Sequence, residues 1–182
     1  MKKEQGYDIR QVLSDMREEY WQGIEGGGEK VAAASRDYLI VELGGERYGF
    51  VAPVAREVLR IPRLVPVPMA EEYISGIINL RGDIVAVTDL RPILGLPGRE
   101  LPERGRLVVV EAAGLLTALL VARVEGINSI AVESIEGWTE GIEGLPREVV
   151  EGQVATEEGL LVLLDMEKLL GRPEFASAQK EA

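Results

Sequence analysis

Short runs in which apolar and polar residues alternate cover most of the chain, and this pattern predicts a protein built mainly of β-strands. The stretch 76–95 shows it best, because two apolar runs flank a tight turn at 81–83. Side chains at every second position of such a run share one face, and a Gly in so short a connection is typical of a β-hairpin. After Asp89 the apolar spacing changes to that of one helical turn, which Gly95 can end.

A different pattern is confined to the N-terminal part of the chain. Over residues 7–22 the apolar positions recur at the spacing of one face of an α-helix. Asp8 stands where an N-cap would, with Gln11 at the spacing of a capping box. Glycines at 26–28 predict a flexible linker. The apolar face of this predicted amphipathic helix consists of Ile9, Val12, Leu13, Met16 and Tyr20.

Three interpretations of this helix are open. It can pack on its own domain, or it can dock on a partner protein or on another copy of the chain. It can also be unfolded when alone, because short isolated helices are marginally stable. We therefore treat its five apolar residues as a candidate partner- or self-docking surface.

The second half of the chain repeats the pattern of the first. A shift of 76 residues places Asp165 on Asp89, and a shift of 69 aligns the strand at 109–111 with that at 40–42. Two half-chains of about 70 residues imply two small β-barrels or sandwiches related by a pseudo-two-fold axis. The expected organisation is an extension at 1–36, subdomains at about 37–97 and 105–172, and a polar tail at 173–182.

The two copies differ at the turn of the hairpin. The first copy has Asn79-Leu80-Arg81-Gly82, whereas the second has Ala-Thr-Glu-Glu at 155–158. A generic turn would satisfy folding in both copies, so an Asn and an Arg in one copy only indicate a task beyond folding. An Arg at the tip of a rigid hairpin, beside a Gly, is well placed to contact a partner.

Charge and composition narrow the functional classes. The net charge of −11 argues against binding to nucleic acid or to an anionic membrane surface. The chain has no Cys and no His, which removes the commonest nucleophilic and acid–base arrangements. Asp89 and Asp165 are expected as helix N-caps rather than as a catalytic pair. We expect no enzymatic activity, no cofactor and no metal.

Residues 37–171 resemble the CheW-like domain, the adaptor domain of bacterial and archaeal chemotaxis. The resemblance is carried by DYLIVELGGERYGF, AREVLRIP, YISGIINLRGDIVAVTDLRPILGL and GLLVLLDMEKLLG. It implies a mostly β fold of two five-stranded, SH3-like barrels with a few short helices and an apolar groove between the barrels. It also implies an adaptor that binds a chemoreceptor tip and the CheW-like regulatory domain of the histidine kinase CheA.

The resemblance further implies which residues bind these partners. They are Asn79, Leu80, Arg81 and Gly82 of the hairpin turn, together with Glu57 and Val58. We expect Arg81→Glu to leave folding intact and to abolish partner binding. The implied location is the cytoplasm, beside membrane receptor arrays that the adaptor reaches through its partners.

Other interpretations stay open at the level of sequence. The adaptor could serve a histidine kinase outside chemotaxis, or the chain could be a small-ligand-binding β-barrel, and self-association is compatible with both. The chain also departs from the common family pattern at two positions. Ala55 stands where the family commonly has Val, and Ala122 stands where it commonly has Asp.

Overall fold

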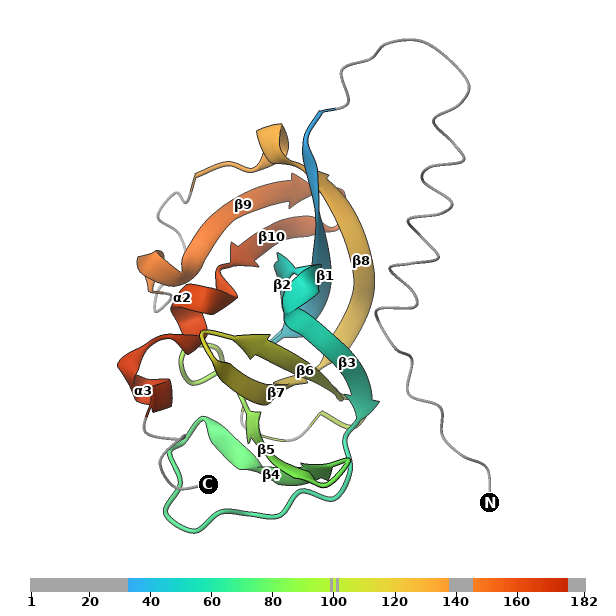
Figure 1. Cartoon of the computed structure of the whole chain (residues 1–182). Helices are drawn as coiled ribbons and strands as arrows, with labels where there is room; N and C mark the ends of the chain where they lie inside the picture. Colours follow the sequence, from blue (N-terminus) through green and yellow to red (C-terminus); the bar gives the residue numbers. More distant parts are fainter. Residues whose placement is uncertain (1–32, 99, 101, 138–145, 177–182) are drawn as a thin grey trace.

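A computed structural model describes residues 33–98, 100, 102–137 and 146–176. In this part of the chain, ten strands form two five-stranded sheets, one above the other in Figure 1. The first sheet has the order β8-β1-β2-β10-β9, and the second has the order β3-β6-β7-β5-β4. The mostly β fold predicted from the sequence is confirmed.

The bounds of the strands follow the apolar runs of the sequence. The first sheet contains β1 (Ser35–Leu43), β2 (Glu46–Val51), β8 (Arg123–Ala131), β9 (Val150–Thr156) and β10 (Gly159–Leu164). The second sheet contains β3 (Ala55–Arg60), β4 (Ile74–Leu80), β5 (Asp83–Thr88), β6 (Arg106–Ala112) and β7 (Leu115–Val121).

The sheets do not follow the predicted division into consecutive subdomains. The boundary expected at 97–105 falls between β5 and β6, which belong to the same sheet. β1 and β2 instead join β8, β9 and β10 from the other half of the chain. The division into 37–97 and 105–172 is therefore wrong, because the first hairpin of each half pairs with the remaining strands of the other half.

The internal repeat nevertheless describes the strands well. The hairpin pairs Leu43↔Glu46 and Ala112↔Leu115 are related by the shift of 69. The pairs Leu80↔Asp83 and Thr156↔Gly159 are related by the shift of 76. In both sheets one pairing is parallel, between β2 and β10 or between β7 and β5. The two sheets thus have equivalent strand orders, built from exchanged halves.

Alternation along the strands divides the core into three clusters. On β1, Tyr38 and Ile40 belong to a cluster on one face of the first sheet, whereas Leu39 and Val41 belong to the largest cluster on the other face. On β6, Leu107 and Val109 belong to a cluster on one face of the second sheet, whereas Val108 and Val110 belong to the largest cluster. The largest cluster therefore holds residues of both sheets, so apolar burial joins them.

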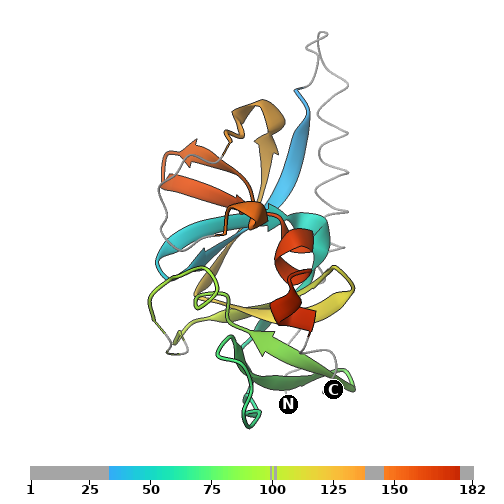
Figure 2. The ribbon, with the colours of Figure 1, turned by 90° about the vertical axis from the view of Figure 1, so that its left-hand side faces the viewer.

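Short helices supply additional apolar side chains to this shared cluster. They are η1 (Ala52–Val54), η3 (Arg147–Val149), α2 (Met166–Leu170) and α3 (Pro173–Ala176), whereas η2 (Val132–Ser134) buries no residue. Figure 2 shows α2 and α3 in front of the region where the two sheets meet. Phe175 of α3 is buried against Tyr73, with ring centroids 5.0 Å apart. The predicted polar tail from 173 is therefore partly wrong, because its first residues belong to the core.

The two aspartates that follow the repeated strands have local structural roles. Asp165 accepts a hydrogen bond from the backbone N–H of Lys168 at 3.1 Å and is the N-cap of α2, as predicted. Asp89 accepts from the backbone N–H and the guanidinium of Arg91, and the residues after it form turns rather than a helix. Both carboxylates are therefore engaged by residues two or three positions further along the chain.

Two further expectations meet the limits of the described residues. The predicted helix at 7–22, with Ile9, Val12, Leu13, Met16 and Tyr20, lies outside them. Among the helices that are described, none has both the length and the apolar composition needed to cross a membrane. In the same residues, no three Asp or Glu side chains are grouped in a way that could hold a metal ion.

Candidate functional site

The hairpin between β4 and β5 presents the Arg that the sequence singled out. Leu80 pairs with Asp83, so the connection consists of Arg81 and Gly82, one residue shorter than predicted. Both have positive φ, 55° for Arg81 and 104° for Gly82, as a type I′ turn requires. The backbone N–H of Gly82 donates to Oδ1 of Asn79 at 2.9 Å. This bond stabilises the turn and fixes the backbone position from which the Arg81 side chain extends.

Arg81 reaches across the open side of the second sheet to Glu57. β3 and β4 are the two end strands of that sheet, and the Arg81 Nη2 to Glu57 Oε2 distance of 2.9 Å links them. Glu57 is only 8% exposed, whereas the Arg81 side chain is 77% exposed. A buried carboxylate needs a charged partner, so Glu57 holds the guanidinium in place while most of it faces solvent.

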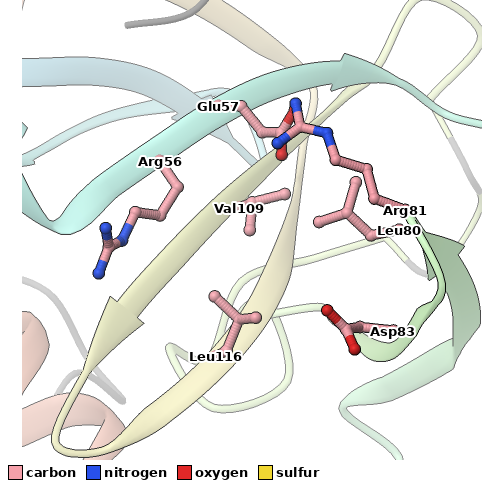
Figure 3. A pocket seen from close by; sticks show the side chains of 7 residues that line it. All are labelled: Arg56, Glu57, Leu80, Arg81, Asp83, Val109 and Leu116. Carbon is pink, nitrogen blue, oxygen red and sulfur yellow. The ribbon is translucent and has the colours of Figure 1, made fainter. Parts of the chain in front are cut away.

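A hollow with a volume of about 340 Å³ lies beside this ion pair (Figure 3). Its apolar surface comes from Leu80, Val109 and Leu116, and its polar rim comes from Arg56, Glu57, Arg81 and Asp83. In Figure 3 the Arg81 side chain extends over the hollow from the hairpin toward Glu57 on β3. Leu116 of β7 lies on the opposite side of the hollow from this ion pair. Its exposed fraction of 40% means that an apolar surface faces solvent there.

The structure brings together only some of the residues that were predicted to bind partners. Glu57, Leu80 and Arg81 line the hollow, and Asn79 and Gly82 shape the turn beside it. Val58 does not join them, because successive side chains of a strand point to opposite faces. Val58 instead packs against the apolar cluster shared by the two sheets.

Four lining residues were not predicted from the sequence: Arg56, Asp83, Val109 and Leu116. Asp83 and Arg56 adjoin predicted residues, so their neighbourhood was a usable signal. Val109 and Leu116 lie in strands that are distant in sequence from the hairpin. They reach the hollow because β6 pairs with β3 and β7, and because β7 pairs with β5 of the hairpin.

The chemistry of the hollow suits contact with another protein. Arg56 pairs with Glu111 at the surface, and Arg81 donates one hydrogen bond to Glu57. In the described residues no other partner of the Arg81 guanidinium is found, so it retains N–H donors for an acceptor from outside. Because Arg81 and Leu116 are so exposed, a small ligand in the hollow would keep much of its surface in water, unlike ligands in enclosed pockets.

Comparisons of the chain with known proteins agree on one family. The model of the CheW-like domain matches residues 37–174. The chain is 30% identical over 141 residues to the chemotaxis protein CheW of Klebsiella aerogenes, covering 78% of this chain and 85% of that protein. It is 26% identical over 140 residues to the chemotaxis protein CheW of Bacillus subtilis, covering 77% and 90%.

A solved structure agrees with these relatives. The crystal structure of the scaffolding protein TtCheW from Thermoanaerobacter tengcongensis matches with a TM-score of 0.68 and 27% sequence identity. The match covers 78% of this chain and 96% of that one. Residues 1–36, which contain the predicted amphipathic helix, lie outside the range of the family model.

Proposed function

Because the chain belongs to the CheW-like domain family, we propose that it is a chemotaxis adaptor that couples a chemoreceptor to the histidine kinase CheA. It does so through protein–protein contacts and without enzymatic activity of its own. Its relatives bear the name of a chemotaxis protein, and the matching solved structure is called a scaffolding protein. The corresponding location is the cytoplasm, beside membrane receptor arrays.

The observation that carries this proposal is the way in which Arg81 is presented. Glu57 on the other end strand holds the guanidinium beside an apolar hollow, with most of the side chain exposed. Arg is favoured at protein interfaces because its planar guanidinium makes directed contacts with acceptors. We therefore assign the receptor- or kinase-binding surface to Arg81, Glu57 and Leu80, with Asn79 and Gly82 supporting the turn.

Two other roles carry less support. An adaptor for a histidine kinase outside chemotaxis would use the same surface, and only the identity of the partner separates it from the proposed role. A small-ligand-binding barrel fits less well, because Arg81 and Leu116, which line the hollow, are exposed to solvent. Docking of the predicted N-terminal helix at 7–22 on a partner or on another copy stays a separate prediction.

The structure changes the experiment that best tests this surface. Arg81→Glu would place a second carboxylate beside buried Glu57, so a loss of binding could reflect misfolding rather than a lost contact. The double variant Glu57→Gln/Arg81→Gln removes both charges, so neither an unpaired carboxylate nor an unpaired guanidinium is left at the site. We expect it to keep the thermal midpoint within a few degrees and to weaken partner binding roughly tenfold or more.

Binding is measured by calorimetry with two probes from the same cell, a chemoreceptor cytoplasmic fragment and the CheA regulatory domain. Arg36→Gln is the matched control, because Arg36 is an exposed Arg of the first sheet that also pairs with a Glu, Glu151. The control should bind as the unaltered protein does. Equal affinity of the double variant would reject the site, and no binding by the unaltered protein would reject the proposed function.

A further inference from the structure

In each sheet the two end strands do not pair with each other, and the internal repeat relates the place between them in one sheet to that in the other. In the second sheet the place is the hollow beside Arg81. The shift of 69 relates Leu116 to Arg47 of β2, and it relates Arg56 to Glu125 of β8. Arg56 and Glu125 are both the extra residue of a β-bulge, which confirms the correspondence. The shift of 76 relates Arg81 to Glu157.

In the first sheet this place is closed by a side chain of the protein itself. The Arg47 guanidinium donates to both carboxylate oxygens of Glu125, with nitrogen–oxygen distances of 2.8 to 3.1 Å. It also donates to Oγ1 of Thr156 at 2.6 Å and forms an ion pair with Glu158 at 2.7 Å. Its side chain is only 12% exposed. Arg47 therefore fills the place between the end strands β8 and β9.

The two carboxylates that hold Arg47 have no counterparts at the equivalent place of the second sheet, and the filling side chain is missing. Glu125 is replaced by Arg56. Glu158 is replaced by Gly82, and its neighbour Glu157 is replaced by Arg81. The position of Arg47 is taken by Leu116, which has no charge and leaves the hollow open. A cation held by carboxylates closes one sheet, whereas the other sheet presents the exposed guanidinium groups of Arg56 and Arg81 to an acceptor from outside.

We infer that the hollow binds a carboxylate side chain of a partner protein, which takes the place that Arg47 takes in the first sheet. The carboxylate accepts hydrogen bonds from Arg81 and lies near Arg56, and an apolar neighbour on the partner covers Leu116. This inference rests on the proposed function, since it names the chemistry of the partner for that surface. It also adds Arg56 and Leu116 to the residues that recognise the partner.

The remaining charges at the hollow restrict how the carboxylate enters. Glu57 is paired with Arg81 and Glu111 is paired with Arg56, so neither Glu is left with an uncompensated charge that would repel the incoming group. Asp83 lies on the hairpin side of the hollow, away from Arg56, and disfavours a carboxylate on that side. A cationic side chain would lack the equivalents of Glu125 and Glu158, the two carboxylates that hold Arg47. A carboxylate that enters between Arg56 and Arg81 can accept from the guanidinium N–H groups that Glu111 and Glu57 leave unused.

Filling the hollow from within the chain tests the inference directly. Leu116→Glu places a carboxylate at the position equivalent to Arg47, and Leu116→Gln places an uncharged side chain of the same length there. We expect Leu116→Glu to weaken binding of the chemoreceptor or CheA fragment at least tenfold more than Leu116→Gln does. Arg56→Gln should also weaken binding, roughly threefold to tenfold, a smaller loss because Arg56 is already paired with Glu111 at the surface.

A second measurement needs no partner. If the arginines hold the new carboxylate, they stabilise its charged form and lower its pKa in the folded state. The stability that this adds to Leu116→Glu is present above the pKa of an ordinary Glu and is lost as pH falls through the lowered value. We therefore expect Leu116→Glu to unfold at a higher temperature than Leu116→Gln near neutral pH, and the gap to close in acid.

The outcomes separate this inference from the proposed function. Equal binding and equal stability of the Leu116→Glu and Leu116→Gln variants would overturn the carboxylate site, even if the unaltered protein binds its partners. Failure of the unaltered protein to bind would overturn the proposed function, while the stability comparison still reports on the hollow. Sedimentation of the protein alone tests whether a second copy of the chain occupies the hollow. A dimer that Leu116→Glu dissociates would overturn the inference, because the occupant would then be a second copy and not a partner protein.

Discussion

The carboxylate of Glu125 shows how a single residue depends on its surroundings in this fold. Its pKa is lowered mainly by the hydrogen bonds from the Arg47 guanidinium, while partial burial acts in the opposite direction. The pKa of Arg47 is raised by the same contact. Both side chains are mostly buried, so this pair is less screened by water than a surface ion pair.

Removing Arg47 should therefore cost stability in a pH-dependent way. Because the folded-state pKa of Glu125 lies below its ordinary value, the contribution of the pair is complete above that ordinary value. It is lost as pH falls through the lowered value. We expect Arg47→Leu to reduce the free energy of unfolding by about 2 kcal/mol near neutral pH, and by clearly less near pH ~3.

Urea unfolding at the two pH values measures this difference. Arg36→Gln is the comparison, because its ion pair with Glu151 involves a side chain that is 56% exposed. It should change the free energy of unfolding by less than about 1 kcal/mol. A loss for Arg47→Leu that is the same at both pH values would show that apolar packing, and not the charge pair, closes the first sheet.

At the scale of elements, a glycine in each half allows a loop to pair with an end strand. Gly76 of β4 precedes the bridge Val65↔Ile77, and Gly152 of β9 precedes the bridge Glu136↔Gln153. A Cβ on either Gly would lie 2.7 Å from a carbonyl oxygen of the loop, that of Val65 or that of Glu136. The repeated Gly thus reflects a repeated close approach of backbone to backbone.

Both glycines should be sensitive to the smallest substitution. We expect Gly76→Ala and Gly152→Ala each to lower the free energy of unfolding by about 1–3 kcal/mol, because rigid loop backbone must move away. The loss at Gly76 should be the greater, since its φ of 146° also disfavours a side chain. Gly137→Ala is the control, because a Cβ there would meet nothing within 4 Å. Thermal unfolding of the three variants measures these losses. A Gly137→Ala variant as unstable as the other two would refute the explanation.

At the scale of the whole molecule, the exchange of hairpins makes the two halves depend on each other. The second sheet joins β3, β4 and β5 from the first half to β6 and β7 from the second. The first sheet reverses this arrangement, and the largest apolar cluster holds residues from both. A cut between β5 and β6 would therefore leave each half with strands that have lost their neighbours.

This arrangement predicts that neither half folds alone. Fragments 33–98 and 99–176 should each lack cooperative thermal unfolding and near-ultraviolet circular dichroism, because each contains incomplete sheets. Mixed or co-expressed, they should form a complex with the chemical-shift dispersion of the intact domain. An isolated fragment with its own cooperative transition would contradict the exchanged topology and favour two consecutive subdomains.

The resemblance and the local patterns explain why the prediction of the hairpin was accurate. A Gly-containing turn between alternating runs depends on residues close in sequence, so 76–95 could be placed without knowing the rest of the fold. The repeat marked Arg81 as a departure from its equivalent in the second half. Glu57 was assigned through the resemblance alone, and the structure adds its reason, an ion pair between the end strands.

The strands of 76–95, the repeat and Arg81 could be predicted from the amino-acid sequence, because they depend on neighbouring residues and on comparison of two stretches. Long-range strand pairing was needed to show that the halves exchange hairpins, that Val58 faces the core and that Leu116 lines the same hollow as Arg81. Strand pairing joins residues far apart in the chain, and apolar strands of similar pattern could satisfy several pairings. The open hollow and its closed counterpart at Arg47 became visible only once the pairing was known.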